Sequence, residues 1–171
     1  MIKRILELYR RLCWSSEKYG RYLGVEIGSR CDIQKVTFGS EPYLISIGDH
    51  VQITNGVKIF THGAAWVFRD KYRELDVFGK VKIKDNVYIG SNSLILPGVT
   101  IGNNCIIGAG SVVTRSVSPG TIVAGNPARV IGKTDDFLKQ VKKMNVGSKG
   151  MLSSEKKRYL LSLPESKFIS K

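Results

Sequence analysis

The chain has 171 residues, of which 27 are Lys or Arg and 14 are Asp or Glu, so its formal net charge is +13 at pH 7. This length supports one hydrophobic core, and 18 glycines beside 5 prolines without a low-complexity tract exclude a disordered or collagen-like chain. The positive charge indicates anionic partners such as phosphates, acidic glycans, nucleic acid or lipid headgroups, and no apolar run is long enough to span a membrane.

The first segment, residues 1–24, is expected to be a helical cap. Its apolar residues recur at helical spacing and predict a helix over residues 2–14. The basic residues that fall outside this apolar stripe are Lys3, Arg4, Arg10 and Arg11. We expect the helix to cover the open strand edges of the following segment, with docking on anionic lipid as the alternative. Because the segment lacks a continuous apolar region and a cleavage site, we expect a cytoplasmic protein without a signal peptide.

A six-residue repeat dominates the middle of the chain. The bulky β-branched residues in register are Ile27, Ile33, Ile47, Ile53, Ile59, Ile83, Ile89, Ile95, Ile101, Ile107 and Val113. The position four residues later is mostly small or β-branched, and Gly90, Gly102 and Gly108 directly follow register residues, where we expect the chain to turn without a Cβ in the way.

A period of six matches neither one nor two turns of an α-helix, so each hexad is predicted to be a short strand and a corner. The register residues then face inward, and polar residues such as Asn86, Asn92 and Asn103 occupy the corners. Three hexads close one coil, and successive coils stack at about 4.8 Å. The predicted fold class is therefore all-β, a parallel β-helix over residues 25–133.

Two further segments interrupt or follow the repeat. Between Ile59 and Ile83 the register is lost, which predicts a loop over residues 64–80 that is expelled from a corner and serves a function. After the repeat, residues 134–171 form a basic extension, in which we expect one helix capped by Thr134 and a second helix that ends at Pro164.

The stretch VYIGSNSLILPGVTIGNNCIIGAGSVVTRSVSPGTIVAGNPARVIGK, from Val87 to Lys133, resembles the hexapeptide-repeat acyltransferases, whose fold is a left-handed parallel β-helix. The resemblance covers roughly residues 25–133. FGSEPYLI and THGAAWVFR are similar to the branch that acetylates saccharide hydroxyls, in the maltose and galactoside acetyltransferase-like group. The resemblance implies acetyl-CoA as co-substrate, direct transfer in a ternary complex, no metal, and a homotrimer with clefts between neighbouring subunits.

His62 stands where the expelled loop leaves the repeat, at the place of the family's catalytic histidine. An imidazole suits the role of general base, because it accepts the proton of an acceptor hydroxyl and returns it to the departing thiolate. Family members often read THDG where this chain reads THGA, so the acidic neighbour is absent. Glu41, Glu74 or a main-chain carbonyl is expected to orient the ring, and Glu41 equally could contact the acceptor. His50 is expected to be a solvated corner residue.

The resemblance also implies the contacts to the thioester end of the coenzyme. The backbone N–H of Ser91 lies beside the acetyl carbonyl, and the main chain of Ala109 contacts the pantetheine arm. Tyr88 stands where the family commonly has Trp and covers part of the thiol end. Cys13, Cys31 and Cys105 are expected to lie on the helix stripe or inside the repeat, so none is expected to be an exposed nucleophile.

The remaining coenzyme contacts are implied at the end of the repeat. Thr114 and Arg115 match the family's coenzyme-contacting pair, and Arg129 and Lys133 are expected to bind the nucleotide phosphates. For Arg129 the alternative is a structural role in capping the last coil. The residues expected to line the acceptor cleft are Glu41, Asn55, Trp66 and Arg69.

The expected function is therefore acetyl-CoA-dependent O-acetylation of a saccharide, with N-acetylation of an amino sugar or nucleotide sugar as the alternative. A γ-type carbonic anhydrase needs three zinc-binding histidines, and the chain has 2. Serine acetyltransferases carry a large helical domain before the repeat, and only about 25 residues precede it here. A structural solenoid and a nucleic-acid-binding protein are disfavoured, because an ordered Thr face and any recognised nucleic-acid module are missing.

Overall fold

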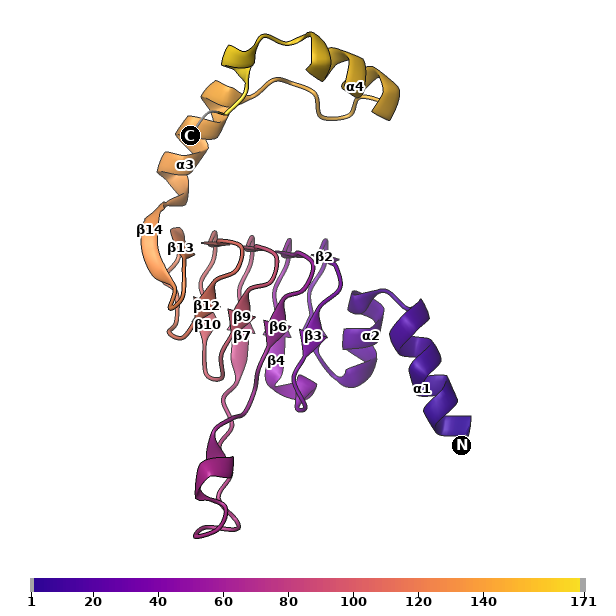
Figure 1. Cartoon of the computed structure of the whole chain (residues 1–171), viewed down its shortest axis with the longest axis vertical. Helices are drawn as coiled ribbons and strands as arrows, with labels where there is room; N and C mark the ends of the chain where they lie inside the picture. The colour runs from indigo at the N-terminus through magenta and orange to yellow at the C-terminus, as the bar shows by residue number, and fades with distance from the viewer. Residues whose placement is uncertain (1, 170–171) are drawn as a thin grey trace. The chain divides into compact units, whose positions relative to one another are not determined.

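The computed structural model describes residues 2–169 of the chain. The chain divides into two compact units, Met1–Thr134 and Asp135–Lys171. The first unit contains the predicted repeat, and its strands form three parallel sheets that share the same coils (Figure 1).

Each coil contributes one short strand to each sheet. Sheet A contains β1 (Glu26–Ile27), β4 (Ile45–Ile47), β7 (Val81–Ile83) and β10 (Thr100–Ile101). Sheet B contains β2 (Asp32–Ile33), β5 (Gln52–Ile53), β8 (Tyr88–Ile89), β11 (Ile106–Ile107), β13 (Thr121–Ala124) and the antiparallel β14 (Arg129–Lys133). Sheet C contains β3 (Thr37–Phe38), β6 (Lys58–Ile59), β9 (Leu94–Ile95) and β12 (Val112–Val113). The three-sided parallel β-helix that the hexads predict is confirmed.

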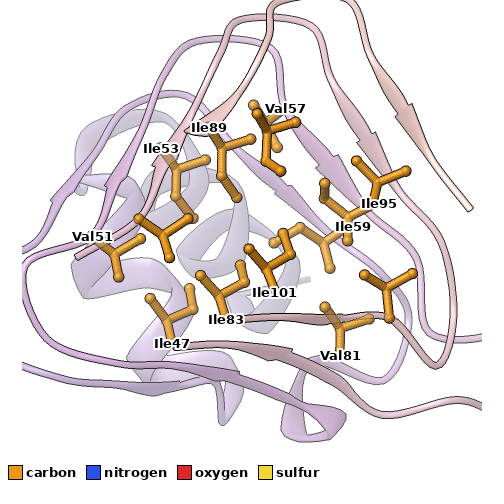
Figure 2. Close-up of a cluster of buried hydrophobic side chains, with 14 of the residues drawn as sticks. Ile47, Val51, Ile53, Val57, Ile59, Val81, Ile83, Ile89, Ile95 and Ile101 are labelled. Carbon is orange, nitrogen blue, oxygen red and sulfur yellow. The ribbon is translucent and has the colours of Figure 1, made fainter. Parts of the chain in front are cut away.

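The register residues form the core, as the repeat predicts. Figure 2 shows isoleucines and valines from all three sides pointing into the centre of the coil. Each register residue lies beside its counterpart in the next coil, for example Ile53 beside Ile89 and Ile89 beside Ile107, and all three are fully buried. Burial of one such side chain contributes about 1.5–3 kcal/mol, so the stacked rows supply the main stabilisation of this unit.

The corners hold the polar residues that the sequence predicts. His50, Asn86 and Asn92 lie there with left-handed backbone, and Asn103 lies in the turn directly before Asn104, whose φ is 57°. The Asn103 side chain accepts a hydrogen bond from the backbone N–H of Asp85 in the adjacent coil at 3.0 Å. A short amide side chain suits either task, and the sequence does not distinguish the two neighbours.

The glycines after register residues are required for a different reason from the one expected. None of Gly90, Gly102 and Gly108 has a positive φ. A Cβ on Gly90 would lie 2.5 Å from the backbone nitrogen of Ala109, and one on Gly108 would lie 2.8 Å from the Cβ of Ala124. Glycine is therefore needed here because adjacent coils approach closely, not because the chain turns.

Two helices precede the repeat, α1 (Ile2–Cys13) and α2 (Ser16–Leu23). The expectation that the helix over residues 2–14 covers the first coil is wrong, because α2 lies against β1 and β2 and α1 packs on α2 (Figure 1). A Cβ on Gly20 would lie 2.8 Å from the Phe38 ring, so this glycine allows α2 to approach the coil. The sequence did not reveal the break between the helices, where the Ser15 side chain caps α2.

The expelled loop leaves the stack after β6 and returns at β7 (Figure 1). An antiparallel bridge between His62 and Phe78 closes its base, so the excursion begins slightly before the expected residues 64–80. The short helix η2 (Ala65–Phe68) lies within it.

The second unit consists of short helices. α3 (Thr134–Met144) crosses the boundary between the units, and α4 (Ser153–Ser162) ends shortly before Pro164, close to the predicted bounds. The Tyr159 hydroxyl donates to the carbonyl of Val146 at 2.8 Å and ties α4 to the preceding segment. No helix within residues 2–169 is long and apolar enough to cross a membrane.

Candidate active site

The imidazole of His62 lies beside the carboxylate of Glu41 at the edge where the chain passes from sheet C to sheet A. Phe38 of β3 pairs with Ile59 of β6, and this register places Glu41 next to His62 in the adjacent coil. His62 Nδ1 and Glu41 Oε2 are 2.9 Å apart. Of the expected orienting groups, the structure therefore supplies Glu41, and Glu74 makes no hydrogen bond with His62 among the described residues.

Two hydroxyls complete this cluster. Thr61 is fully buried, and its Oγ1 donates to the same Glu41 Oε2 at 2.7 Å. Ser40 Oγ lies 3.1 Å from His62 Nδ1. The Thr61 hydrogen bond lowers the pKa of Glu41 below its ordinary value, and His62 and Ser40 add to this effect against the opposing influence of desolvation. Glu41 is thus held as a carboxylate, although its side chain is only 16% exposed.

An ionised carboxylate only accepts hydrogen bonds, so its contact assigns the proton of a neutral His62 ring to Nδ1. Nε2 then carries the lone pair, and within residues 2–169 no group forms a hydrogen bond with it. The His62 side chain is 44% exposed, and its ring lies 6.2 Å from that of Phe78 at the base of the loop. This arrangement can accept a proton from a group outside the chain.

A second edge of the β-helix, where the chain passes from sheet B to sheet C, carries other expected site residues. Asn55, Ser91 and Ala109 occupy equivalent positions in successive coils there, because the carbonyls of Asn55 and Ser91 accept from the N–H groups of Asn92 and Gly110. Among the described residues, the backbone N–H groups of Ser91 and Ala109 donate to no acceptor. They are therefore available to an external oxygen. The Ser91 hydroxyl donates to Thr54 Oγ1 at 3.1 Å and is partly buried.

One chain does not bring these two edges together. His62 and Glu41 lie at one end of the sheet C strands, and Ser91 and Ala109 lie at the other end. The expected acceptor residues are divided in the same way. Asn55 lies on the Ser91 edge, Glu41 lies beside His62, and Trp66 and Arg69 lie on or next to η2 in the expelled loop.

The expected phosphate-binding residues gather at the end of the β-helix. A cavity of about 350 Å³ is lined by Arg115, Arg129 and Lys133 together with hydroxyl side chains that include Ser116 and Thr121. None of the three cations forms an ion pair within the described part of the chain. Arg129 Nη1 donates only to the carbonyl of the adjacent Ala128, at 3.1 Å, which leaves most of its guanidinium donors available.

The remaining expected residues are placed as follows. Tyr88 lies on β8 and is exposed, a few residues before Ser91. Thr114 is exposed and directly follows β12. His50 Nδ1 lies 2.8 Å from Asn86 Oδ1 on the third edge, between sheets A and B. Cys105 is buried as expected and Cys31 is half-buried, but Cys13 on α1 is exposed, so the expectation that the helix stripe covers Cys13 is wrong. It fails because the α1 face that carries Cys13 is not packed against the repeat.

Sequence reasoning missed Ser40 and Thr61. Ile59 faces inward, and side chains alternate along a strand, so Thr61 two residues later is expected to face inward as well. The sequence could therefore have indicated a buried hydroxyl directly before His62. Ser40 carries no comparable signal. Its place beside His62 depends on the pairing of two coils.

Three known proteins are similar to this chain, one in sequence and two in solved structure. Protein CapG of Staphylococcus aureus is 48% identical over 166 residues, which cover 95% of each chain. The structure of a maltose O-acetyltransferase from Clostridium difficile 630 matches with 31% identity and a TM-score of 0.53, over 77% of this chain and 83% of that one. A galactoside acetyltransferase structure in complex with coenzyme A matches with 26% identity and a TM-score of 0.55, over 81% of this chain and 82% of that one.

For two other curated relatives, the region that matches this chain covers only 45% and 47% of the relative's own length. The structural likenesses imply the left-handed sense of the β-helix. The family described as bacterial transferase hexapeptide (six repeats) matches residues 80–115, where the hexads are uninterrupted. With a relative nearly half identical along almost its whole length, the chain belongs to the hexapeptide-repeat transferase family.

Proposed function

We propose that this protein transfers the acetyl group of acetyl-CoA directly to a hydroxyl group of a saccharide, with His62 as the general base. The protein is an acetyltransferase that uses acetyl-CoA, like its relatives. The observation that carries the proposed mechanism is the bond between His62 Nδ1 and Glu41 Oε2, which leaves Nε2 available at an exposed position.

The reaction follows from this geometry. Nε2 takes the proton of the acceptor hydroxyl while its oxygen attacks the thioester carbonyl. The tetrahedral intermediate carries a negative oxygen, and the backbone N–H of Ser91 is the proposed donor to it. Collapse breaks the carbon–sulfur bond, and the imidazolium returns its proton to the CoA thiolate. Glu41 stabilises the imidazolium between these two steps, because the carboxylate lies against its Nδ1.

The separation of His62 from Ser91 supports a homotrimer. If the sheet C to sheet A edge of one subunit faces the sheet B to sheet C edge of the next, the base and the N–H donors meet in one cleft. Three such contacts close a ring around a threefold axis. A single chain holds only half of each proposed cleft, so we expect light scattering to give three times the chain mass and a monomer to be inactive.

The coenzyme phosphates are proposed to bind at Arg115, Arg129 and Lys133. These cations line one cavity and have no acidic partner among the described residues, which suits a ligand with several phosphate groups. Thr114 and Arg115 lie on the same edge as His62, two coils further along. The thioester end can therefore lie toward His62 while the phosphates remain at the end of the β-helix.

A saccharide acceptor is supported by the names of the maltose and galactoside acetyltransferases that the chain resembles. Trp66 is highly exposed on the loop, and an indole face is a good platform for the apolar side of a sugar ring. Arg69 and Asn55 are proposed to donate hydrogen bonds to its hydroxyl groups. The alternative acceptor is an amino sugar or nucleotide sugar, and it requires the same base.

The test measures CoA release with a thiol reagent against a panel of saccharides and amino sugars. We expect turnover with at least one hydroxyl acceptor, and His62→Ala to lower kcat by about 10²- to 10⁴-fold while acetyl-CoA still binds in calorimetry. Undiminished turnover in His62→Ala would exclude His62 as the base. His50→Ala is the matched control, and it should retain activity.

A further inference from the structure

The outer face of α1 is apolar and lies opposite the side that packs on α2. The packed side is polar: Glu7 accepts a hydrogen bond from the Tyr19 hydroxyl, and Arg10 donates one to the Tyr22 hydroxyl, both at 2.8 Å. At 100° per residue, Leu8, Leu12 and Ile5 project from the opposite side of the helix. Their exposed fractions are 57%, 73% and 61%.

This arrangement is unusual for a helix that serves only to cap a core. A capping helix buries its apolar stripe and exposes its polar face, whereas α1 does the reverse. The first coil is already covered by α2. Leu12 also borders an open cavity that residues of α2 and β3 line, but Ile5, Leu8 and Leu12 all remain largely exposed, so the stripe is available to a partner outside this chain.

Charge identifies the chemistry of that partner. The α1 segment carries Lys3, Arg4, Arg10 and Arg11 against a single acid, Glu7. Glu7 and Arg10 both lie on the packed side and are 3.5 Å apart, so their charges offset each other and the excess positive charge of the segment comes from Lys3, Arg4 and Arg11.

One aromatic residue of α1, Tyr9, extends this outer surface, whereas Trp14 lies on the packed side with its ring edge-on to that of Tyr22 at 5.7 Å. Trp14 has the Lys18 ammonium 4.3 Å and the Arg10 guanidinium 5.7 Å from its ring centroid. Tyr9 on the helix is exposed. Leucine, isoleucine and tyrosine beside arginine are residues that helices lying in a lipid interface use.

We infer that α1 docks the protein on an anionic lipid surface, with Ile5, Leu8 and Leu12 in the boundary between headgroups and acyl chains and Arg4 at the headgroups. The net charge of +13 favours the same surface over long range. A second copy is a poorer occupant, because pairing two α1 helices would bring like charges together. The inference goes beyond acetyl transfer and does not depend on it.

The experiment is sedimentation of the full chain with vesicles. We expect it to sediment with vesicles of equal parts phosphatidylglycerol and phosphatidylcholine, to do so less as salt rises, and to remain in solution with phosphatidylcholine alone. Absence of binding to the phosphatidylglycerol vesicles at low salt would overturn the inference.

Two pairs of variants assign the binding to α1. Leu12→Gln should weaken partitioning by about 10-fold, because it removes one inserted apolar side chain without changing charge. Leu161→Gln is its control, since Leu161 on α4 is 77% exposed and of the same type. Arg4→Gln should weaken partitioning by about 5-fold, with Arg158→Gln on α4 as its control.

Equal losses in the α4 variants would place the binding in the basic second unit and contradict the inference. A lower molecular mass of Leu12→Gln in light scattering would show instead that α1 is an interface between copies. CoA release by Leu12→Gln should equal that of the unmodified protein, which shows that the variant is folded.

Discussion

Thr61 and His62 are adjacent in sequence and contact the same carboxylate oxygen, Oε2 of Glu41, at 2.7 and 2.9 Å. The first contact is buried inside the coil, and the second opens to the surface where the loop departs. Glu41 therefore links the core of the β-helix to the proposed base. The hydroxyl acts on the imidazole only through this carboxylate, so Thr61 is a positioning residue.

Glu41→Gln removes the negative charge that orients His62 and stabilises its protonated form. We expect kcat to fall by about 10- to 100-fold, with little change in the KM for acetyl-CoA, because the imidazolium exists only during the reaction. Steady-state CoA release measures both constants. Glu74→Gln is the matched control and should leave them unchanged. Equal losses in the two variants would show that Glu41 has no special role.

Thr61→Val keeps the shape of the buried side chain and removes its hydroxyl. Because the Thr61 hydrogen bond is the main cause of the lowered pKa of Glu41, its loss should raise that pKa toward the ordinary value. The titration of the Glu41 carboxyl group, followed by carbon NMR, should then move to higher pH, and Thr61→Ser should restore it. If the valine variant keeps the original titration, Thr61 serves only to fill space.

The lowered pKa of Glu41 also predicts how stability depends on pH. A carboxyl group with a depressed pKa in the folded state contributes stability above its unfolded pKa, and this contribution is lost as the pH falls through the folded pKa. The unfolding free energies of the unmodified protein and Glu41→Gln should therefore converge as the solution becomes more acidic. Urea unfolding at a series of pH values between about 3 and 7 measures this difference. A pH-independent difference would contradict the assignment.

Ser91 is proposed to act through its backbone N–H, while its hydroxyl is engaged with Thr54. Ser91→Ala should therefore keep kcat within about 3-fold, because a partly buried hydrogen bond between neutral hydroxyls contributes little. Single-turnover acetyl transfer measures the effect on the chemical step. A loss of 100-fold or more would show that the side chain itself takes part.

Arg129→Ala tests the proposed phosphate site. Loss of one guanidinium contact to a phosphate should raise the KM for acetyl-CoA by about 10-fold with kcat nearly unchanged. Titration of acetyl-CoA at saturating acceptor gives both constants. An unchanged KM together with a lower thermal midpoint would favour the role of Arg129 in capping the last coil.

The sequence by itself determined the β-helix and its core. In a solenoid each hexad contacts only its neighbours in adjacent coils, so the inward position of Ile89 or Ile101 depends on local alternation and not on distant segments. The position of His62 at the base of the loop was visible for the same reason, since the register simply stops after Ile59.

Only the tertiary structure decided which groups meet His62. Paired residues in regular coils, such as Ile95 and Val113, are 18 residues apart, but Phe38 and its partner Ile59 are 21 apart. The coil that contains Glu41 is therefore longer than three hexads, and the position of Glu41 depends on how this irregular coil closes. The position of α1 also depended on tertiary packing, because α2 covers the first coil and α1 packs on α2. Both outcomes arise from packing between segments distant in the chain, which a local hydrophobic pattern does not contain.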